Sequence, residues 1–280
     1  MVKLGHLFAL MIAAAPGLSG CGLYVPEIQE FPSKPGDAQL LVDAIVRSIH
    51  CELREGVRYV IDEDKKSIQR NGARTVPWFD TWGVGGVLTL TVAEKTEVNP
   101  TALWSPNIIF SLAGGIDGFA QATRIDTLNF YYNVGDLYTE AENELRQTGA
   151  VCLGGAGPHP VGSLLIDNNL KIKEWLETQM LPIGTGEITA ITKNGITHDI
   201  KFEVSSTGSI TPTWKLSRVI SVNPSGTLLS TNRDRTHELA ITFGPADPDQ
   251  KALVGSAAAQ FAASQFGIAI ASHLKNALAP

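Results

Sequence analysis

Short segments in which apolar and polar residues alternate constrain the fold of this chain most strongly. Three of them lie close together, at residues 87–92, 108–112 and 125–132. Successive side chains of a strand point to opposite faces, so alternation predicts strands with one buried face. Gly114, Gly115 and Gly118 supply a turn before the third segment, because glycine accepts the positive φ values of turns. Neighbouring strands joined in this way predict an antiparallel sheet.

The same pattern returns later in the chain at a nearly constant offset. Leu88, Leu90 and Val92 match Ile200, Phe202 and Val204 at an offset of 112 residues. Arg124, Leu128, Phe130 and Tyr132 match Arg235, Leu239, Ile241 and Phe243 at an offset of 111 residues. The pair Pro100-Thr101 also has a counterpart in Pro212-Thr213. These matches indicate an internal duplication with pseudo-twofold character, because two copies are too few for a solenoid. The alternative is the general similarity of any two alternating strands.

A helix is expected before each set of strands. Asp37 can cap the first, which should run to about Asp62 with an apolar stripe of Leu41, Ile45, Ile49, Leu53, Val57 and Val60. Asn168 or Asn169 can cap the second, whose stripe is Ile172, Trp175, Leu176 and Met180. Asp247-Pro248 predicts the start of a third helix, because a capping carboxylate precedes proline at the first helical position.

Together these elements predict an α+β fold with an antiparallel sheet from two pseudo-repeated helix-plus-three-strand units. The units would span residues 37–150 and 151–246, a C-terminal Ala-rich helix would span 247–280, and 37–280 would form one compact domain. Residues 252–272 carry no charge. We expect this helix to pack on the sheet, because small residues allow close approach. Contact with a second copy and membrane insertion are the alternatives for this stretch.

The N-terminal residues have the layout of a secretory signal. Lys3 precedes an uncharged run to Gly17, and Leu18-Ser19-Gly20-Cys21 follows. These four residues resemble the lipobox of bacterial lipoprotein precursors, in which a leucine and two small residues precede an invariable cysteine. The resemblance implies that residues 1–20 are removed and that Cys21 becomes a lipid-modified N-terminus. The alternative is a buried N-terminal helix, which Pro16-Gly17 would break before Cys21.

The same resemblance implies a location in the bacterial cell envelope. In the lipoprotein family, aspartate after the modified cysteine favours retention in the inner membrane, so Gly22 favours the outer membrane. Acyl chains such as palmitate on Cys21 would attach the protein to the membrane, since several chains bind stably where one is marginal. Residues 21–36, which are rich in proline, would form an extended tether to the folded part.

Two further cysteines, Cys51 and Cys152, form a candidate disulfide in an oxidising compartment. Such a bond would close a loop of about 100 residues and stabilise the fold by about 4–5 kcal/mol in the chain-entropy model. Two separate buried thiols are the alternative. The net charge of −6 argues against nucleic acid as a partner.

The sequence contains no catalytic motif. Its histidines have no metal-ligand spacing, and no serine lies in a nucleophile elbow. We therefore predict no catalytic residue, no metal and no cofactor. The acidic residues 62–64 are expected to be a solvated helix end.

Two groups of residues are candidates for a binding surface. Trp78, Phe79 and Trp82 could be exposed anchors in a loop, or a hydrophobic plug at the edge of the sheet. Arg124 and Arg235 could bind a carboxylate or a sugar, or form cross-strand ion pairs.

The sequence favours a non-enzymatic envelope lipoprotein that binds another envelope protein or a cell-wall glycan. One alternative is a periplasmic hydrolase whose site is assembled only in three dimensions. A third reading is a subunit of an oligomeric outer-membrane assembly that uses the alternating strands. Residues 252–272 are a separate candidate for a contact between copies. A deep pocket with a histidine beside a carboxylate would favour the hydrolase. A flat aromatic or apolar patch would favour the binding module.

Overall fold

The computed structural model describes residues 25–28, 37–98, 101–107, 110–115, 118–152, 169–184, 187–188, 194–210, 220–221, 229–247, 249 and 251–278. The secretory signal, Cys21 and most of the expected tether lie outside these residues. The chain divides into two compact units. The strand unit comprises residues 1–28, 90–125 and 203–236, and the core unit comprises residues 29–89, 126–202 and 237–280.

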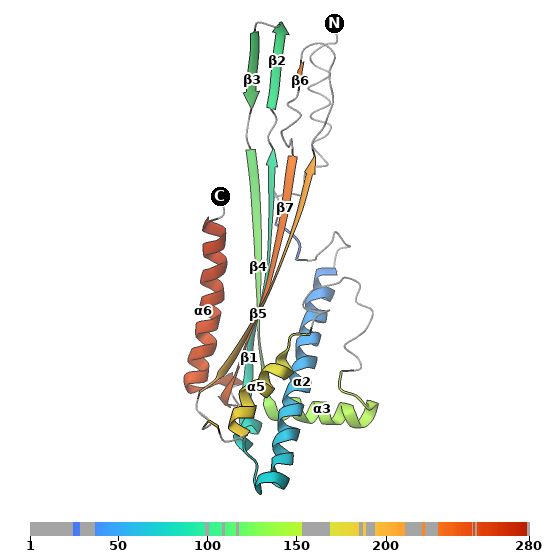
Figure 1. Cartoon of the computed structure of the whole chain (residues 1–280), viewed down its shortest axis with the longest axis vertical. Helices are drawn as coiled ribbons and strands as arrows, with labels where there is room; N and C mark the ends of the chain where they lie inside the picture. Colours follow the sequence, from blue (N-terminus) through green and yellow to red (C-terminus); the bar gives the residue numbers. More distant parts are fainter. Residues whose placement is uncertain are drawn as a thin grey trace. The chain divides into compact units, whose positions relative to one another are not determined.

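The fold is mixed α+β, with an antiparallel five-stranded sheet (Figure 1). The strands are β1 (Trp82–Val98), β4 (Gly118–Asn133), β5 (Ile196–Ile210), β7 (Leu229–Asp247) and β8 (Ala252–Leu253). Their order is β4-β1-β7-β5, and the short β8 pairs with the end of β7. Each predicted alternating segment in this sheet lies within a longer strand.

A second, three-stranded sheet lies in the strand unit. It comprises β2 (Thr101–Asn107), β3 (Phe110–Gly115) and β6 (Ile220–Ser221), in the order β3-β2-β6. Both pairs are antiparallel, and Trp104 of β2 lies opposite Leu112 on one side and Ile220 on the other. The sequence predicted a strand at 108–112, of which the structure describes the part from Phe110, but it did not predict β2.

Helix α2 (Asp37–Asn71) carries the predicted apolar stripe into the core. All six stripe residues are at most 4 % exposed. The predicted end at Asp62 was wrong, because α2 continues for nine more residues and ends before Gly72, whose φ of 79° is left-handed. Gly72 donates its N–H to the carbonyl of Ile68, which closes the helix.

The acidic residues 62–64 therefore lie inside α2 and not at a solvated end. Asp64 has a side chain only 2 % exposed and accepts hydrogen bonds from Arg74 Nε at 2.7 Å and from the backbone N–H of Thr75 at 2.7 Å and Val76 at 2.9 Å. Arg74 also forms a two-point ion pair with Asp80 at 2.6 and 2.7 Å. Asp64 thus fixes the chain that connects α2 to the short 3₁₀ helix η2 (Pro77–Thr81).

Helix α3 (Val134–Thr148), which the sequence analysis did not predict, begins directly after β4. The side chain of Asn133 caps it by accepting the N–H of Gly135 at 2.8 Å, and Gly149 ends it with a φ of 80°. Figure 1 shows α3 crossing α2. Two ion pairs join the helices, Arg54 to Glu144 at 3.0 Å and Arg58 to Glu142 at 2.8 Å.

Helix α5 (Ile172–Gly184) packs against α2, and its predicted stripe is buried at Ile172, Leu176 and Met180. Trp175 of α5 lies against the sheet, 5.9 Å from the ring of Phe243 in β7 and 4.8 Å from the ring of His198 in β5. Helices α2 and α5 therefore cover one face of the sheet in the core unit.

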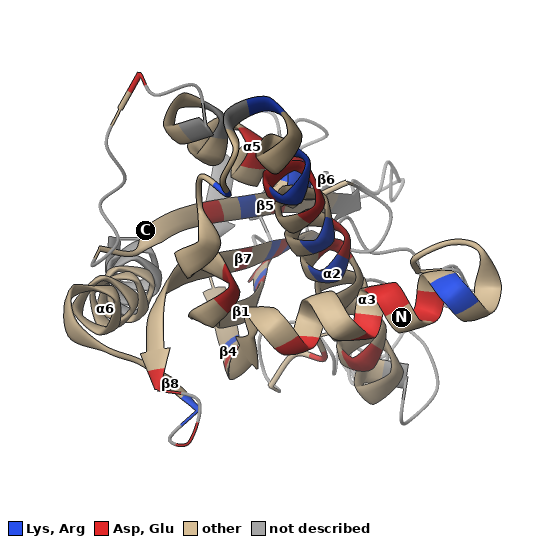
Figure 2. Cartoon of the chain, turned by 90° about the horizontal axis from the view of Figure 1, so that it is seen from below, with Lys and Arg blue, Asp and Glu red and all other residues tan. Residues whose placement is uncertain are grey.

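Helix α6 (Gly255–Leu278) covers the opposite face of the sheet in the core unit (Figure 2). Ala257 is fully buried, and Ile268 packs with Val87 and Ala240 of the central strands. The predicted start at Asp247-Pro248 was wrong. Asp247 is the last residue of β7, and its carboxylate accepts the N–H of Asp249 in the turn that leads to β8.

Candidate functional site

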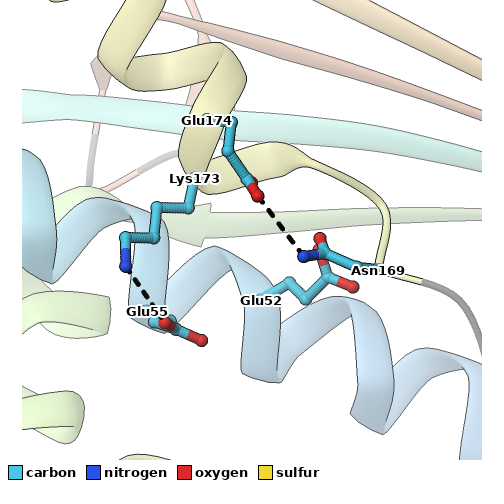
Figure 3. A pocket seen from close by; sticks show the side chains of 5 residues that line it. All are labelled: Glu52, Glu55, Asn169, Lys173 and Glu174. Atoms are coloured by element: carbon cyan, nitrogen blue, oxygen red, sulfur yellow. Dashed lines mark hydrogen bonds and ion pairs between the residues drawn. The ribbon is translucent and has the colours of Figure 1, made fainter.

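A polar hollow lies where the start of α5 meets α2 (Figure 3). Its volume is about 280 Å³. Three carboxylates, one amide and one ammonium group line it, from Glu52, Glu55, Asn169, Lys173 and Glu174. Helix α2 supplies the first two side chains, whereas α5 and the residues just before it supply the other three.

Glu52 is the most deeply placed acid of this hollow. Its two carboxylate oxygens accept the backbone N–H of Leu170 at 2.8 and 3.0 Å. Burial raises the pKa of Glu52, while hydrogen bonds from the backbone of Leu170 and Ile172 partly oppose that rise. The N–H groups at the start of a helix lack partners within the helix, and a carboxylate there is stabilised by the helix dipole. Glu52 is therefore a cap for α5 that is supplied by α2.

The other side chains of the hollow are also engaged within the chain. Lys173 Nζ lies 3.5 Å from Glu55 Oε1, and Asn169 Nδ2 donates to Glu174 at 3.4 Å (Figure 3). Asn169 also accepts the N–H of Lys171 at 2.7 Å. No histidine, cysteine or serine lines the hollow. This arrangement serves helix docking.

A histidine does lie beside a carboxylate elsewhere in the core unit. Nε2 of His50 in α2 is 3.2 Å from Oε2 of Glu140 in α3, and the His50 ring stacks on Tyr132 at 4.7 Å. Burial lowers the pKa of His50, and Arg54 lowers it further, against the opposing effect of Glu140 and Glu144. An open hollow of about 200 Å³ includes Glu140 in its lining, but His50 does not line it. Of this pair, Glu140 therefore borders the hollow and His50 does not.

The aromatic cluster Trp78, Phe79 and Trp82 is not an exposed surface. Phe79 is fully buried and Trp82 is 3 % exposed, while Trp78 is half-buried. The Phe79 ring lies 6.0 Å from that of Phe243, and the Trp78 ring lies 4.4 Å from that of Trp82. The exposed-anchor interpretation was wrong for Phe79 and Trp82, because their rings fill the core between η2 and β7.

The two arginines of the repeated pattern both lie in the strand unit. Arg235 is 6 % exposed and donates to Ser206 Oγ at 3.3 Å, so the prediction that it lies on a binding surface was wrong. Arg124 is 3.6 Å from the carboxylate of Glu27 and remains partly exposed. Arg233 donates to the backbone carbonyl of Glu27 at 2.6 Å and pairs with Glu94 at 3.1 Å. Residues 25–28 are therefore held on strands β4 and β7.

Cys51 and Cys152 are joined by a disulfide, with Cα atoms 5.6 Å apart. The bond fixes the segment after α3 to the middle of α2. This is the pair that the cysteine content of the chain pointed to.

Among the residues that the structure describes, no three His, Cys, Asp or Glu side chains are grouped so that they could hold a metal ion. In the same part of the chain, no helix combines the length and apolar character needed to cross a membrane. That statement includes the described residues of α6.

Comparison of the chain with known proteins gives no match. The chain matches no protein-family model, and no curated protein is significantly similar to it.

Proposed function

We propose that this chain is a lipid-anchored envelope lipoprotein that acts as a non-enzymatic binding or structural module. The non-enzymatic part of the proposal is carried by the hollow between α2 and α5, whose polar side chains are all engaged within the chain. Glu52, its most buried acid, caps α5, and the surrounding side chains bind one another. A general acid or base must instead reach the proton of a substrate directly or through one water.

The anchor and location rest on the sequence. Leu18-Ser19-Gly20-Cys21 supports lipid modification of Cys21, and Gly22 supports the outer membrane. An oxidising envelope is also the compartment in which a disulfide such as Cys51–Cys152 persists. The partner would be another envelope protein or a cell-wall glycan.

We also propose that the sheet arose by duplication of a helix-plus-strands unit. The sequence match relates β1 to β5 and β4 to β7, and the sheet order β4-β1-β7-β5 supports it. In this order, moving β4 and β1 by two strand positions along the sheet places them on β7 and β5, the strands that they match. A twofold axis through the sheet would instead exchange β1 with β7, so a shift fits the duplication better than pseudo-twofold symmetry.

Co-purification from detergent-solubilised envelopes tests the proposed role. We expect the lipidated chain to retain a specific envelope protein or peptidoglycan fragment, and to leave generic esterase and glycosidase substrates unchanged. The hydrolase alternative rests on the His50–Glu140 pair. The hydrolase alternative would replace the proposal if the protein purifies without a partner, turns over such a substrate, and loses this turnover in His50→Ala.

A further inference from the structure

The two edges of the large sheet are long. The β4 edge carries little protection, whereas β5 carries the charged residues Asp199, Lys201 and Glu203. β4 forms one edge with 16 residues, and β5 forms the other with 15 residues. Neither pairs with a further strand among the described residues, and neither contains proline. Natural proteins usually blunt such edges with short strands, prolines, charges or bulges. From Thr127 to Asn133, β4 has no charged residue at all.

The directions of these edge strands make them complementary. Neighbouring strands of an antiparallel sheet alternate in direction, so in the order β4-β1-β7-β5 the strands β4 and β5 run in opposite directions. A second copy placed beside β5 in the same orientation would present its β4 as the next antiparallel strand. Backbone hydrogen bonds would then continue the sheet, as in other cases of strand addition.

Both edges of the core unit also present apolar side chains on the same face. Tyr132 stacks on His50 of α2, and His198 stacks on Trp175 of α5, so these residues mark the face that the two helices cover. Alternation places Leu128 and Phe130 on that face of β4, and Ile200 and Phe202 on that face of β5.

These edge residues are incompletely buried. Leu128 is 40 % exposed, and Phe130, Ile200 and Phe202 are partly exposed. In the central strands Leu88, Leu239 and Ile241 are fully buried. A strand added at either edge would cover apolar surface that the single chain leaves in water.

We propose that β5 of one copy pairs with β4 of the next, with Ile200 and Phe202 against Leu128 and Phe130 of the neighbour. The contact is heterologous, because each copy uses two different edges, and it generates a ring if the rotation closes or a filament if it does not. This inference goes beyond the proposed function and does not depend on the lipid anchor. It places the contact between copies at the sheet edges and not at residues 252–272.

Cysteine cross-linking of the full chain in mild detergent tests this pairing. Thr127 and Lys201 are exposed positions on the two edges of the core unit, so Thr127→Cys and Lys201→Cys should leave the fold intact. A short bis-maleimide should join a mixture of the two variants into dimers. It should join neither variant to itself, and it should convert the double variant into a ladder of multimers.

The proposal would be overturned if no mixed dimers form although the variants unfold at the wild-type temperature. It would also be overturned if Thr127→Cys alone is linked to itself, or if a Phe266→Cys variant is linked to itself while the two edge variants are not linked to each other. Phe266 is 70 % exposed on α6 and reports the alternative contact. The wild-type chain is the control that tests separately whether Cys21 carries a lipid. It stays unlinked where Cys21 is acylated, and it reacts with the reagent where Cys21 is a free thiol.

Discussion

A Cβ atom on Gly244 of β7 would lie 2.3 Å from the Cβ of Ala257 in α6. Real Cβ atoms do not approach so closely, so α6 rests on the sheet where glycine leaves room for it. Gly85 of β1 plays a similar part against Phe261, whose ring would be 3.1 Å from an added Cβ. Ala257 of α6 thus packs closely on the sheet at Gly244.

Gly244→Ala should weaken this packing. The added methyl group forces α6 away from the sheet, and overpacking of this kind typically costs about 1–3 kcal/mol. The free energy of unfolding in urea measures the effect. Gly267→Ala is the matched control, because an added Cβ there meets no atom within 4 Å. This control should stabilise the helix by about 0.5–1 kcal/mol. Equal stability of Gly244→Ala and wild type would contradict the docking of α6.

Asp64→Ala should be among the most destabilising single changes in α2. It removes the buried acceptor of Arg74 and of the backbone at Thr75 and Val76. Breaking a buried ion pair typically costs about 3–5 kcal/mol, although Asp80 still pairs with Arg74 and should keep the loss near the lower figure. Chemical denaturation gives the value. Glu63→Ala, at an exposed neighbouring acid, should change stability by less than about 1 kcal/mol.

Removal of the disulfide should lower stability substantially. Cys51 and Cys152 are 101 residues apart, so their bond restricts the unfolded chain by about 4–5 kcal/mol in the chain-entropy model. A double Cys51→Ala/Cys152→Ala variant should show a lower Tm. A reducing agent should lower the Tm of the wild type and leave that of the double variant unchanged. An unaffected wild-type Tm would count against the bond.

His50 should make stability depend on pH. Burial lowers the pKa of His50 in the folded state, so the unfolded state binds the proton more readily. The stability that the neutral imidazole contributes is therefore present above about pH 6.5 and is lost as the pH falls below that value. We expect the wild type to lose more stability than His50→Gln between about pH 8 and pH 5. Parallel curves for the two proteins would rule out this role for His50.

The sequence predicted those helices and strands whose buried residues recur at the regular spacing of a helix or a strand. The stripe from Leu41 to Val60 is buried because it repeats at helical spacing. The sequence pattern did not predict helix α3, because the helix directly follows the aromatic strand residues Tyr131 and Tyr132. Asn133 and Gly149, which cap its two ends, were the available signal.

The site depended on contacts between distant residues, which the sequence pattern does not encode. Glu52 caps the backbone of Leu170 across 118 residues, and no local spacing indicates that pairing. The sequence left open whether Phe79 is an exposed anchor or a hydrophobic plug, because its burial is decided by Phe243, far away in the chain. Asp64 was likewise predicted to be solvated, because the sequence pattern does not show that Arg74 folds back and donates to it.

Mass spectrometry of the N-terminal peptide tests the envelope-lipoprotein account most directly. The account predicts that the mature chain begins at Cys21, that this residue carries acyl chains, and that Cys21→Ala abolishes both lipid labelling and membrane attachment. Recovery of an intact peptide that contains Leu18-Ser19-Gly20-Cys21, or of an unmodified Cys21 in a membrane-bound protein, would contradict it.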